Sequence, residues 1–149
     1  MKGSMDQDRQ LAEFVVRMEF AQLTARDRSV AKAGILDSIG VMISGAQSPT
    51  VRCLEEEVQS WGGKGDAVVV GRKLRTPAVW AGLLNGTAAH AGHFDDRNPI
   101  LFGHPSCTLV PVLVSTPPLK PLSGKDWLAA YACGFEVGIK LARVAMPSL

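Results

Sequence analysis

The sequence predicts a mainly α-helical protein, a helical bundle of about five to six helices with at most one short β-hairpin. Apolar residues recur at helical spacing along most of the 149 residues, and typical helix-starting residues precede most of these stretches. Only AVVVG, at 67–71, has the β-branched composition of a strand. The length favours one domain, which we place at residues 5–149. Residues 1–4, MKGS, resemble a cloning remnant ahead of a native start at Met5.

The first two helices are predicted from an apolar face and from a capping motif. One apolar face, with residues at i, i+3, i+4 and i+7, comprises Leu11, Phe14, Val15 and Met18. The second helix begins after Thr24, a good N-cap with Asp27 in the first turn, and runs to about Gly45. Six alanine, glycine and serine residues between positions 31 and 44 allow neighbours to come close. We therefore expect this helix to be central, despite the cost of helical glycine.

The middle of the chain predicts two further helices around one strand. SPT, at 48–50, is an N-cap followed by proline at the first helical position, and the third helix runs through Trp61. The strand is expected at 67–71. RTP, at 75–77, is predicted to cap a fourth helix at about 78–91.

The last third contains one ambiguous segment and one clear helix. CTLVPVLV, at 107–114, is apolar, and Pro111 would either kink a helix or restrict a strand to an edge. STPPLKP, at 115–121, is a break, because adjacent prolines exclude helix before them. SGKD, at 123–126, is predicted to cap a last helix through Leu141.

Composition excludes several classes of protein. The net charge is +2 and basic residues are mixed with acidic ones, so no basic stripe indicates a nucleic-acid partner. No apolar run reaches the roughly 18 residues of a membrane span, and the first residues lack the apolar core of a secretory signal. The three cysteines have no CxxC spacing, so we expect free thiols and a cytoplasmic location.

The polar residues of highest interest lie in one segment, 85–113. It contains all three histidines and the adjacent pair Asp95 and Asp96. His90 and His93 could share a face with Asp95 as metal ligands, but two histidines and one carboxylate in a loop are a weak signal. We therefore expect no metal, and we expect His90 to be a packing residue at a helix end.

Four segments in order resemble the MmgE/PrpD family, which includes 2-methylcitrate dehydratases, cis-aconitate decarboxylases and iminodisuccinate epimerases. They are ILDSIGVMISGA (35–46), AVVVGRKLRTPAVWAGLLNGTAAHAGHFDD (67–96), GHPSCTLVPVL (103–113) and SGKDWLAAYACGFEVGIKLAR (123–143). The resemblance implies part of a helical domain, a small polycarboxylate substrate, and no metal or organic cofactor.

The resemblance also suggests roles for single residues. It makes His104 the proton-transfer group, a task that suits imidazole at neutral pH. Asp95 and Asp96 would line the substrate side, where neighbouring carboxylates can also orient donors or cap the next turn. His93 and Arg97 are placed among the substrate-binding residues as well, although they stand where the family usually has Asp and Thr. Arg97 could hold a substrate carboxylate through two hydrogen bonds, or it could fill the pocket.

The resemblance covers only the front third of a typical family member. The remaining helices, a lid domain and further catalytic residues would lie in segments outside this chain. We therefore predict a truncated family member that is inactive in isolation, or alternatively a non-catalytic helical oligomerisation or binding module. Apolar helix faces without partners predict a homodimer that buries residues 31–45 or 125–144.

Overall fold

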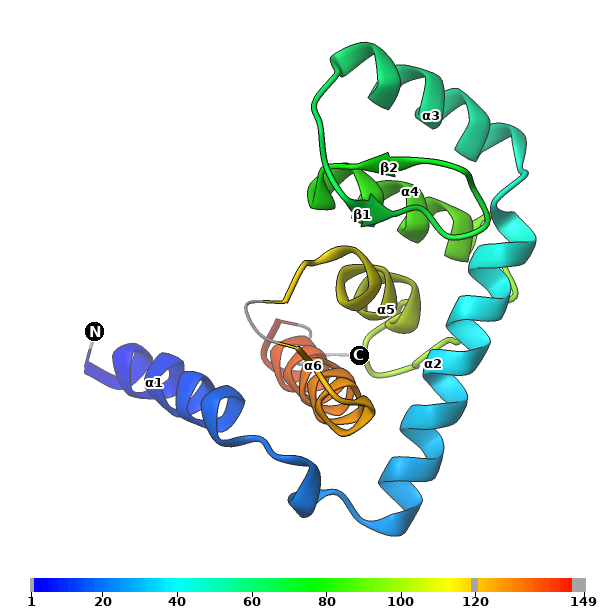
Figure 1. Ribbon diagram of the computed structural model, residues 1–149. Coiled ribbons are helices and arrows are strands. Elements are labelled where there is room, and N and C mark those ends of the chain that lie inside the picture. The colour runs from blue at the N-terminus through cyan, green and yellow to red at the C-terminus, as the bar shows by residue number, and fades with distance from the viewer. Residues whose placement is uncertain (1, 119–120, 146–149) are drawn as a thin grey trace.

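The computed structural model describes residues 2–118 and 121–145, and Figure 1 shows its helices, with one small hairpin near the top of the view. The described residues form six α-helices, one 3-10 helix and one two-stranded antiparallel sheet, which confirms the predicted mainly α fold. In chain order the elements are α1 (Lys2–Arg17), η1 (Phe20–Gln22), α2 (Ala25–Gly45), α3 (Pro49–Trp61), β1 (Ala67–Val68), β2 (Arg75–Thr76), α4 (Ala78–His90), α5 (Ser106–Ser115) and α6 (Gly124–Ala145).

Three of the predicted helix starts are confirmed. Thr24 and Asp27 form a reciprocal capping box at the start of α2, with the Thr24 hydroxyl accepting from the Asp27 N–H. Ser48 caps α3 by accepting from the Val51 N–H at 3.3 Å, with proline in the first turn. Ser123 directly precedes α6. Its N–H and its hydroxyl both donate to Oδ2 of Asp126, each at 2.7 Å.

The predicted strand and the start of the fourth helix differ in detail from expectation. Only Ala67–Val68 of the predicted 67–71 is a strand, paired with Arg75–Thr76. The chain turns immediately afterwards, with Gly71 at a φ of 72°. RTP stands at the start of α4 as predicted, with Pro77 as the N-cap residue, but no side chain forms a cap bond there and Thr76 belongs to β2.

The ambiguous apolar segment is a helix, α5, with Pro111 inside it. Both Val110 and Pro111 are fully buried, so packing on several sides outweighs the hydrogen bond that proline removes. Close contact with α4 contributes, since a Cβ at Gly86 would lie 3.3 Å from the Cys107 carbonyl oxygen. Of the predicted break at 115–121, Ser115 is still helical as the last residue of α5, residues 116–118 and 121 are non-helical, and residues 119–120 lie outside the described residues.

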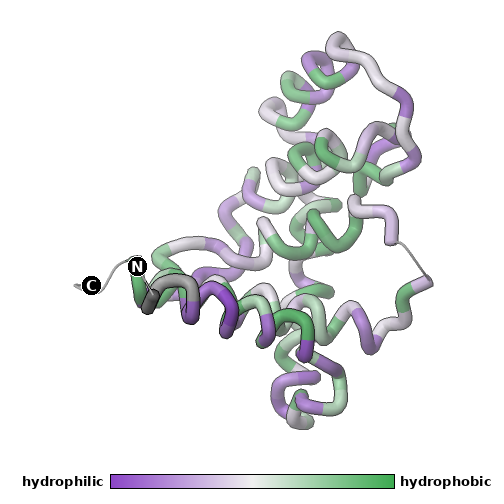
Figure 2. Tube along the Cα trace, turned by 90° about the vertical axis from the view of Figure 1, so that its left-hand side faces the viewer, coloured by the Kyte–Doolittle hydropathy of each residue, from purple (hydrophilic) through white to green (hydrophobic). Residues whose placement is uncertain are grey.

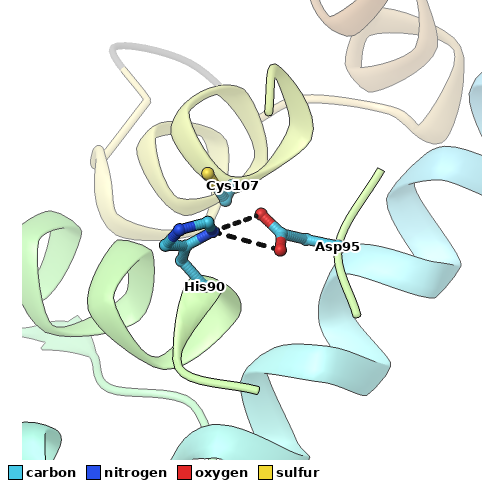
Figure 3. Close-up of side chains that lie close together, drawn as sticks. All are labelled: His90, Asp95 and Cys107. Carbon is cyan, nitrogen blue, oxygen red and sulfur yellow. Dashed lines mark hydrogen bonds and ion pairs between the residues drawn. The ribbon is translucent and has the colours of Figure 1, made fainter. Parts of the chain in front are cut away.

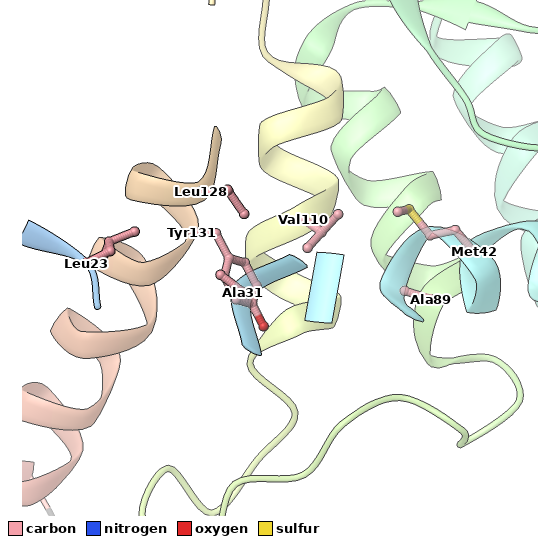
Figure 4. Close-up of a cluster of buried hydrophobic side chains, with 7 residues drawn as sticks. All are labelled: Leu23, Ala31, Met42, Ala89, Val110, Leu128 and Tyr131. Atoms are coloured by element: carbon pink, nitrogen blue, oxygen red, sulfur yellow. The ribbon is translucent and has the colours of Figure 1, made fainter. Parts of the chain in front are cut away.

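The main core lies where α2 packs against α4, α5 and α6, as Figure 4 shows. Its buried members are Leu23, Ala31, Met42, Ala89, Val110, Leu128 and Tyr131. A Cβ at Gly45 would lie 2.0 Å from the Ala88 carbonyl oxygen, and one at Gly34 would lie 2.3 Å from the Tyr131 hydroxyl. Small residues therefore do permit close approach along α2, and its predicted central place is confirmed.

A buried amide connects the hairpin to the helices. Asn85 of α4 is fully buried, and its side chain accepts from the Val70 N–H at 2.8 Å. Its amide group donates to the Val68 carbonyl at 2.9 Å and to the Ser115 hydroxyl at 3.0 Å. A second apolar cluster beneath α3 and the hairpin packs on the same helix; it comprises Val51, Val58, Val69, Ala81, Leu84 and Ala88.

Some apolar side chains remain on the outside of the helices. The helix α1, which starts at the end marked N, is largely hydrophilic in Figure 2. By contrast Leu36 and Ile43 of α2 are 73% and 56% exposed, and a Cβ at Gly40 between them would meet no other atom. Within the described ranges, no helix alone has the length and apolarity to cross a membrane, although α2 and α3, bent by 82°, pass that test as a pair.

Candidate active site

Asp95 is the centre of a buried polar cluster between α4 and α5. Its side chain is only 1% exposed, although the segment that carries it has no helix or strand. His90, the last residue of α4, directs Nδ1 at this carboxylate, 2.9 Å from Oδ2 and 3.1 Å from Oδ1 (Figure 3). Asp95 thus joins an irregular segment to the end of a rigid helix.

His104 approaches the same carboxylate from the other end of the segment. Its Nδ1 lies 3.3 Å from Asp95 Oδ2, and the ring centroid lies 4.8 Å from that of His90. The nitrogen is buried, and within the described residues it completes no well-aligned hydrogen bond. The 3.3 Å approach is therefore a poorly aligned polar contact, and 31% of the His104 side chain reaches solvent.

The electrostatics of the cluster keep the carboxylate charged and the nearby thiol neutral. Burial alone raises the pKa of Asp95, but hydrogen bonds from His90 and Cys107 outweigh it and hold that pKa below its ordinary value. Burial, together with hydrogen bonding to Asp95 and the charge of that carboxylate, raises the pKa of Cys107 to about 12. Cys107 is therefore a protonated thiol at neutral pH and no nucleophile.

Asp96 points into a different network, which begins α5. Its carboxylate oxygens accept from the Ser106 N–H at 3.0 Å and from the Ser106 hydroxyl at 2.7 Å. That hydroxyl also lies 2.7 Å from the hydroxyl of Tyr131, and the Ser38 hydroxyl donates to the Ser106 carbonyl at 3.3 Å. Asp96 therefore acts as the cap of α5, one of the two roles open to it from sequence.

The two unusual residues of the segment, His93 and Arg97, are exposed. His93 has a positive φ of 53°, donates its N–H to the His90 carbonyl at 3.1 Å, and lies 4.7 Å from the His90 ring. Arg97 makes no hydrogen bond or ion pair with any residue that the structure describes. Both side chains are thus available to a ligand, and their substrate roles remain predictions.

One set of side chains could hold a metal ion. Ligand atoms of His90, Asp95 and Cys107 all lie within 4.8 Å of one another. The possible metal ligands named from the sequence were His90, His93 and Asp95, so the structure has Cys107 in place of His93. The prediction that no metal is used remains a prediction.

A hollow lies beside His104. It measures about 220 Å³ and is lined by His104, Thr108 of α5 and Gly138 of α6, among others. Sites that enclose a small ligand typically measure about 300–1,000 Å³. The described residues therefore provide a partial wall next to the imidazole.

Sequence reasoning missed two members of the cluster, His90 and Cys107. His90 was expected to pack and is instead bonded to a carboxylate five positions later. Its position at the end of a predicted helix, just before the acidic pair, was the available signal. Nothing in the spacing of Cys107 indicated a contact with Asp95, since twelve positions and an irregular segment separate them.

Comparison with known proteins identifies the family. A sequence model described as the MmgE/PrpD N-terminal domain matches residues 9–148. Cis-aconitate decarboxylase of Mus musculus is 33% identical over 113 residues, covering 72% of this chain and 23% of that protein. Cis-aconitate decarboxylase of Homo sapiens is 29% identical over 134 residues, covering 86% and 27%. The chain thus spans about a quarter of the length of these curated relatives. Because the family match extends over nearly all of its residues, the chain belongs to the MmgE/PrpD family.

Proposed function

We propose that this chain supplies one wall of an active site for small polycarboxylates, with His104 as the proton-transfer group. The observation that carries the proposal is the buried Asp95 carboxylate shared by two imidazoles. The family chemistry would be dehydration, decarboxylation or epimerisation, and the relatives named as cis-aconitate decarboxylases favour cis-aconitate as the first compound to test.

The chemistry follows from the tautomer that a carboxylate selects. An ionised Asp95 only accepts hydrogen bonds, so it favours a proton on Nδ1 of His104 and leaves Nε2 with a free lone pair. An imidazole oriented in this way can take a proton from carbon and return it. The 3.3 Å contact is long and poorly aligned, as catalytic hydrogen bonds often are before substrate binds.

Substrate carboxylates would be held by the exposed side chains of the same segment, the Arg97 guanidinium first and then His93. Arg97 has no partner within the described residues, so its guanidinium can bind a carboxylate, by donating hydrogen bonds to it, without first breaking an ion pair. In this account Asp95 orients His104 and Asp96 shapes α5, and neither carboxylate touches the substrate.

We also propose that the chain alone does not turn over substrate. The side chains of His90 and His104 are 43% and 31% exposed, and the adjacent hollow is small. Proton transfer at carbon needs a site that excludes water and fixes the substrate. A cytoplasmic setting, without nucleic-acid or membrane partners, is part of the same proposal, and the three cysteines are free thiols.

The test is to incubate the purified chain with cis-aconitate, 2-methylcitrate and iminodisuccinate and to record NMR spectra. We expect no turnover, but we expect millimolar ligand to shift the ring signals of His104. Arg97→Gln should weaken that binding several-fold at unchanged melting temperature, because the residue is exposed and unpaired. Turnover that is lost in His104→Ala would contradict the proposed inactivity, and ligands that leave His104 unshifted would contradict the site.

The alternative function is a non-catalytic helical oligomerisation or binding module, most simply a homodimer. The observation that favours it is a groove of about 960 Å³ between α2 and the start of α6, lined by Ile35, Leu36, Ile39, Trp127 and Leu128 among others. This groove lies between the two helices, α2 and α6, that were predicted as alternative dimer interfaces. Sedimentation should then show a dimer that Leu36→Lys converts to monomer, whereas a monomeric parent chain would exclude this alternative.

A further inference from the structure

We infer that His90 is a positioning residue that fixes the Asp95 carboxylate in the orientation needed by His104. The inference rests on the proposed function of His104 and adds a third residue to that site. Its basis is one shared atom: Asp95 Oδ2 is 2.9 Å from Nδ1 of His90 and 3.3 Å from Nδ1 of His104.

Asp95 needs such an anchor because its own backbone does not provide one. It lies in the irregular segment between α4 and α5, where local turns, an isolated bridge between Asn98 and Gly103 and the bonds of Asp96 to Ser106 order the chain without directing the Asp95 side chain. A short side chain on this kind of segment has no fixed direction unless other groups hold it.

His90 is suited to be the anchor because it stands on a rigid element. The preceding residues of α4, Ala88 and Ala89, are each 1% exposed and belong to the two core clusters. Its Nδ1 reaches both carboxylate oxygens, at 3.1 and 2.9 Å, and so restrains the carboxylate as a whole. Burial does not hold this ring in place, since 43% of the side chain is exposed. The hydrogen bond to Asp95 orients it, together with edge contacts to the rings of His93 and His104.

The direction of the effect follows from this arrangement. With His90 in place, Oδ2 is presented to His104, and the proton of His104 is favoured on Nδ1. Without His90, the carboxylate can rotate away, and the preference of His104 for the Nδ1–H tautomer should weaken. We expect its tautomer ratio to fall by roughly fivefold, which corresponds to one hydrogen bond of ordinary net strength.

The experiment measures the ring ¹⁵N shifts of His104 in the full chain, at a pH about two units above the ordinary imidazole pKa of about 6.5. His90→Phe keeps a ring and removes the donor, whereas His90→Asn keeps a nitrogen at the δ position. His93→Gln is the matched control, because the exposed His93 ring contacts His90 but makes no bond to Asp95 in the described residues. Melting temperatures verify folding, and His90→Gln, which moves the nitrogen to the ε position, replaces His90→Phe if that variant does not fold.

The outcomes separate this inference from the proposed function. We expect the Nδ1–H tautomer of His104 to predominate in the parent chain, in His90→Asn and in His93→Gln, and its ratio to the Nε2–H tautomer to fall about fivefold in His90→Phe. If that ratio is unchanged in His90→Phe, if it falls equally in His90→Asn, or if His93→Gln has the same effect, the positioning role is overturned. A parent chain in which His104 carries its proton on Nε2 would instead remove the basis of the proposed function itself.

Discussion

Replacing Asp96 with alanine tests whether this residue is the cap of α5 or a ligand for substrate. The change removes two charge-assisted hydrogen bonds, at 3.0 and 2.7 Å, from Ser106, which is 1% exposed. The Ser106 N–H then has no partner at the start of the helix, and its hydroxyl keeps only Tyr131. A residue that served only the substrate would leave stability unchanged.

The expected loss can be derived from these contacts. Hydrogen bonds to charged groups contribute about 1.5–3 kcal/mol each, and loss of a helix cap costs about 0.5–2 kcal/mol. Since Asp96 is itself partly exposed, we expect about 2–4 kcal/mol in all. For a chain of this length each kcal/mol lowers the melting temperature by about 2–4 °C, so the total shift is roughly 4–16 °C.

The assay is thermal unfolding followed by circular dichroism, with Asp66→Ala as the control because Asp66 is exposed in a loop. The control should change stability by no more than about 0.5 kcal/mol. A cycle with Ser106→Ala should show coupling of about 0.5–3 kcal/mol, since the two side chains bond directly. If Asp96→Ala unfolds at the temperature of the control, or if the cycle is additive, the capping role is refuted.

Three further predictions concern packing and reactivity. Gly45→Ala should destabilise the fold by at least about 1–3 kcal/mol in denaturant unfolding, because its Cβ would lie 2.0 Å from the Ala88 carbonyl oxygen; an unchanged midpoint would contradict that contact. Asn85→Leu should cost about 3–5 kcal/mol in the same assay, because three polar groups lose their buried partner, and a loss below about 1 kcal/mol would contradict the network. At pH 8 iodoacetamide should modify the exposed Cys53 well before Cys107, because a pKa of about 12 keeps the Cys107 thiol protonated at pH 8. Mass spectrometry that shows Cys107 modified first would contradict this environment.

The helices could be predicted from sequence largely because their starts are local. Thr24 and Asp27 are three residues apart, so the capping box is visible in the sequence alone. Whether residues 107–114 form a helix or a strand could not be predicted locally, because Pro111 is compatible with either. The burial of this segment between neighbouring helices favours the helix α5. The absence of a side-chain cap at α4 depended on the pairing of Thr76 with β1, which is likewise a tertiary feature.

The candidate site was predictable in composition but not in geometry. The segment with the acidic pair and the histidines was visible in the sequence, and the structure brings three of its residues, His90, Asp95 and His104, together. Which carboxylate met which partner depended on the path of the chain, including the positive φ at His93. As a result Asp95 and Asp96, adjacent in sequence, belong to two separate networks.

The central claim is that the Asp95 carboxylate orients His104 for proton transfer, and the ring nitrogen spectrum of His104 tests it most directly. Long-range ¹H–¹⁵N spectra of the parent chain and of Asp95→Asn would be compared at a pH where the imidazoles are neutral. We predict the Nδ1–H tautomer of His104 in the parent chain and its loss in Asp95→Asn. The same tautomer in both proteins, or the Nε2–H tautomer in the parent chain, would contradict the account.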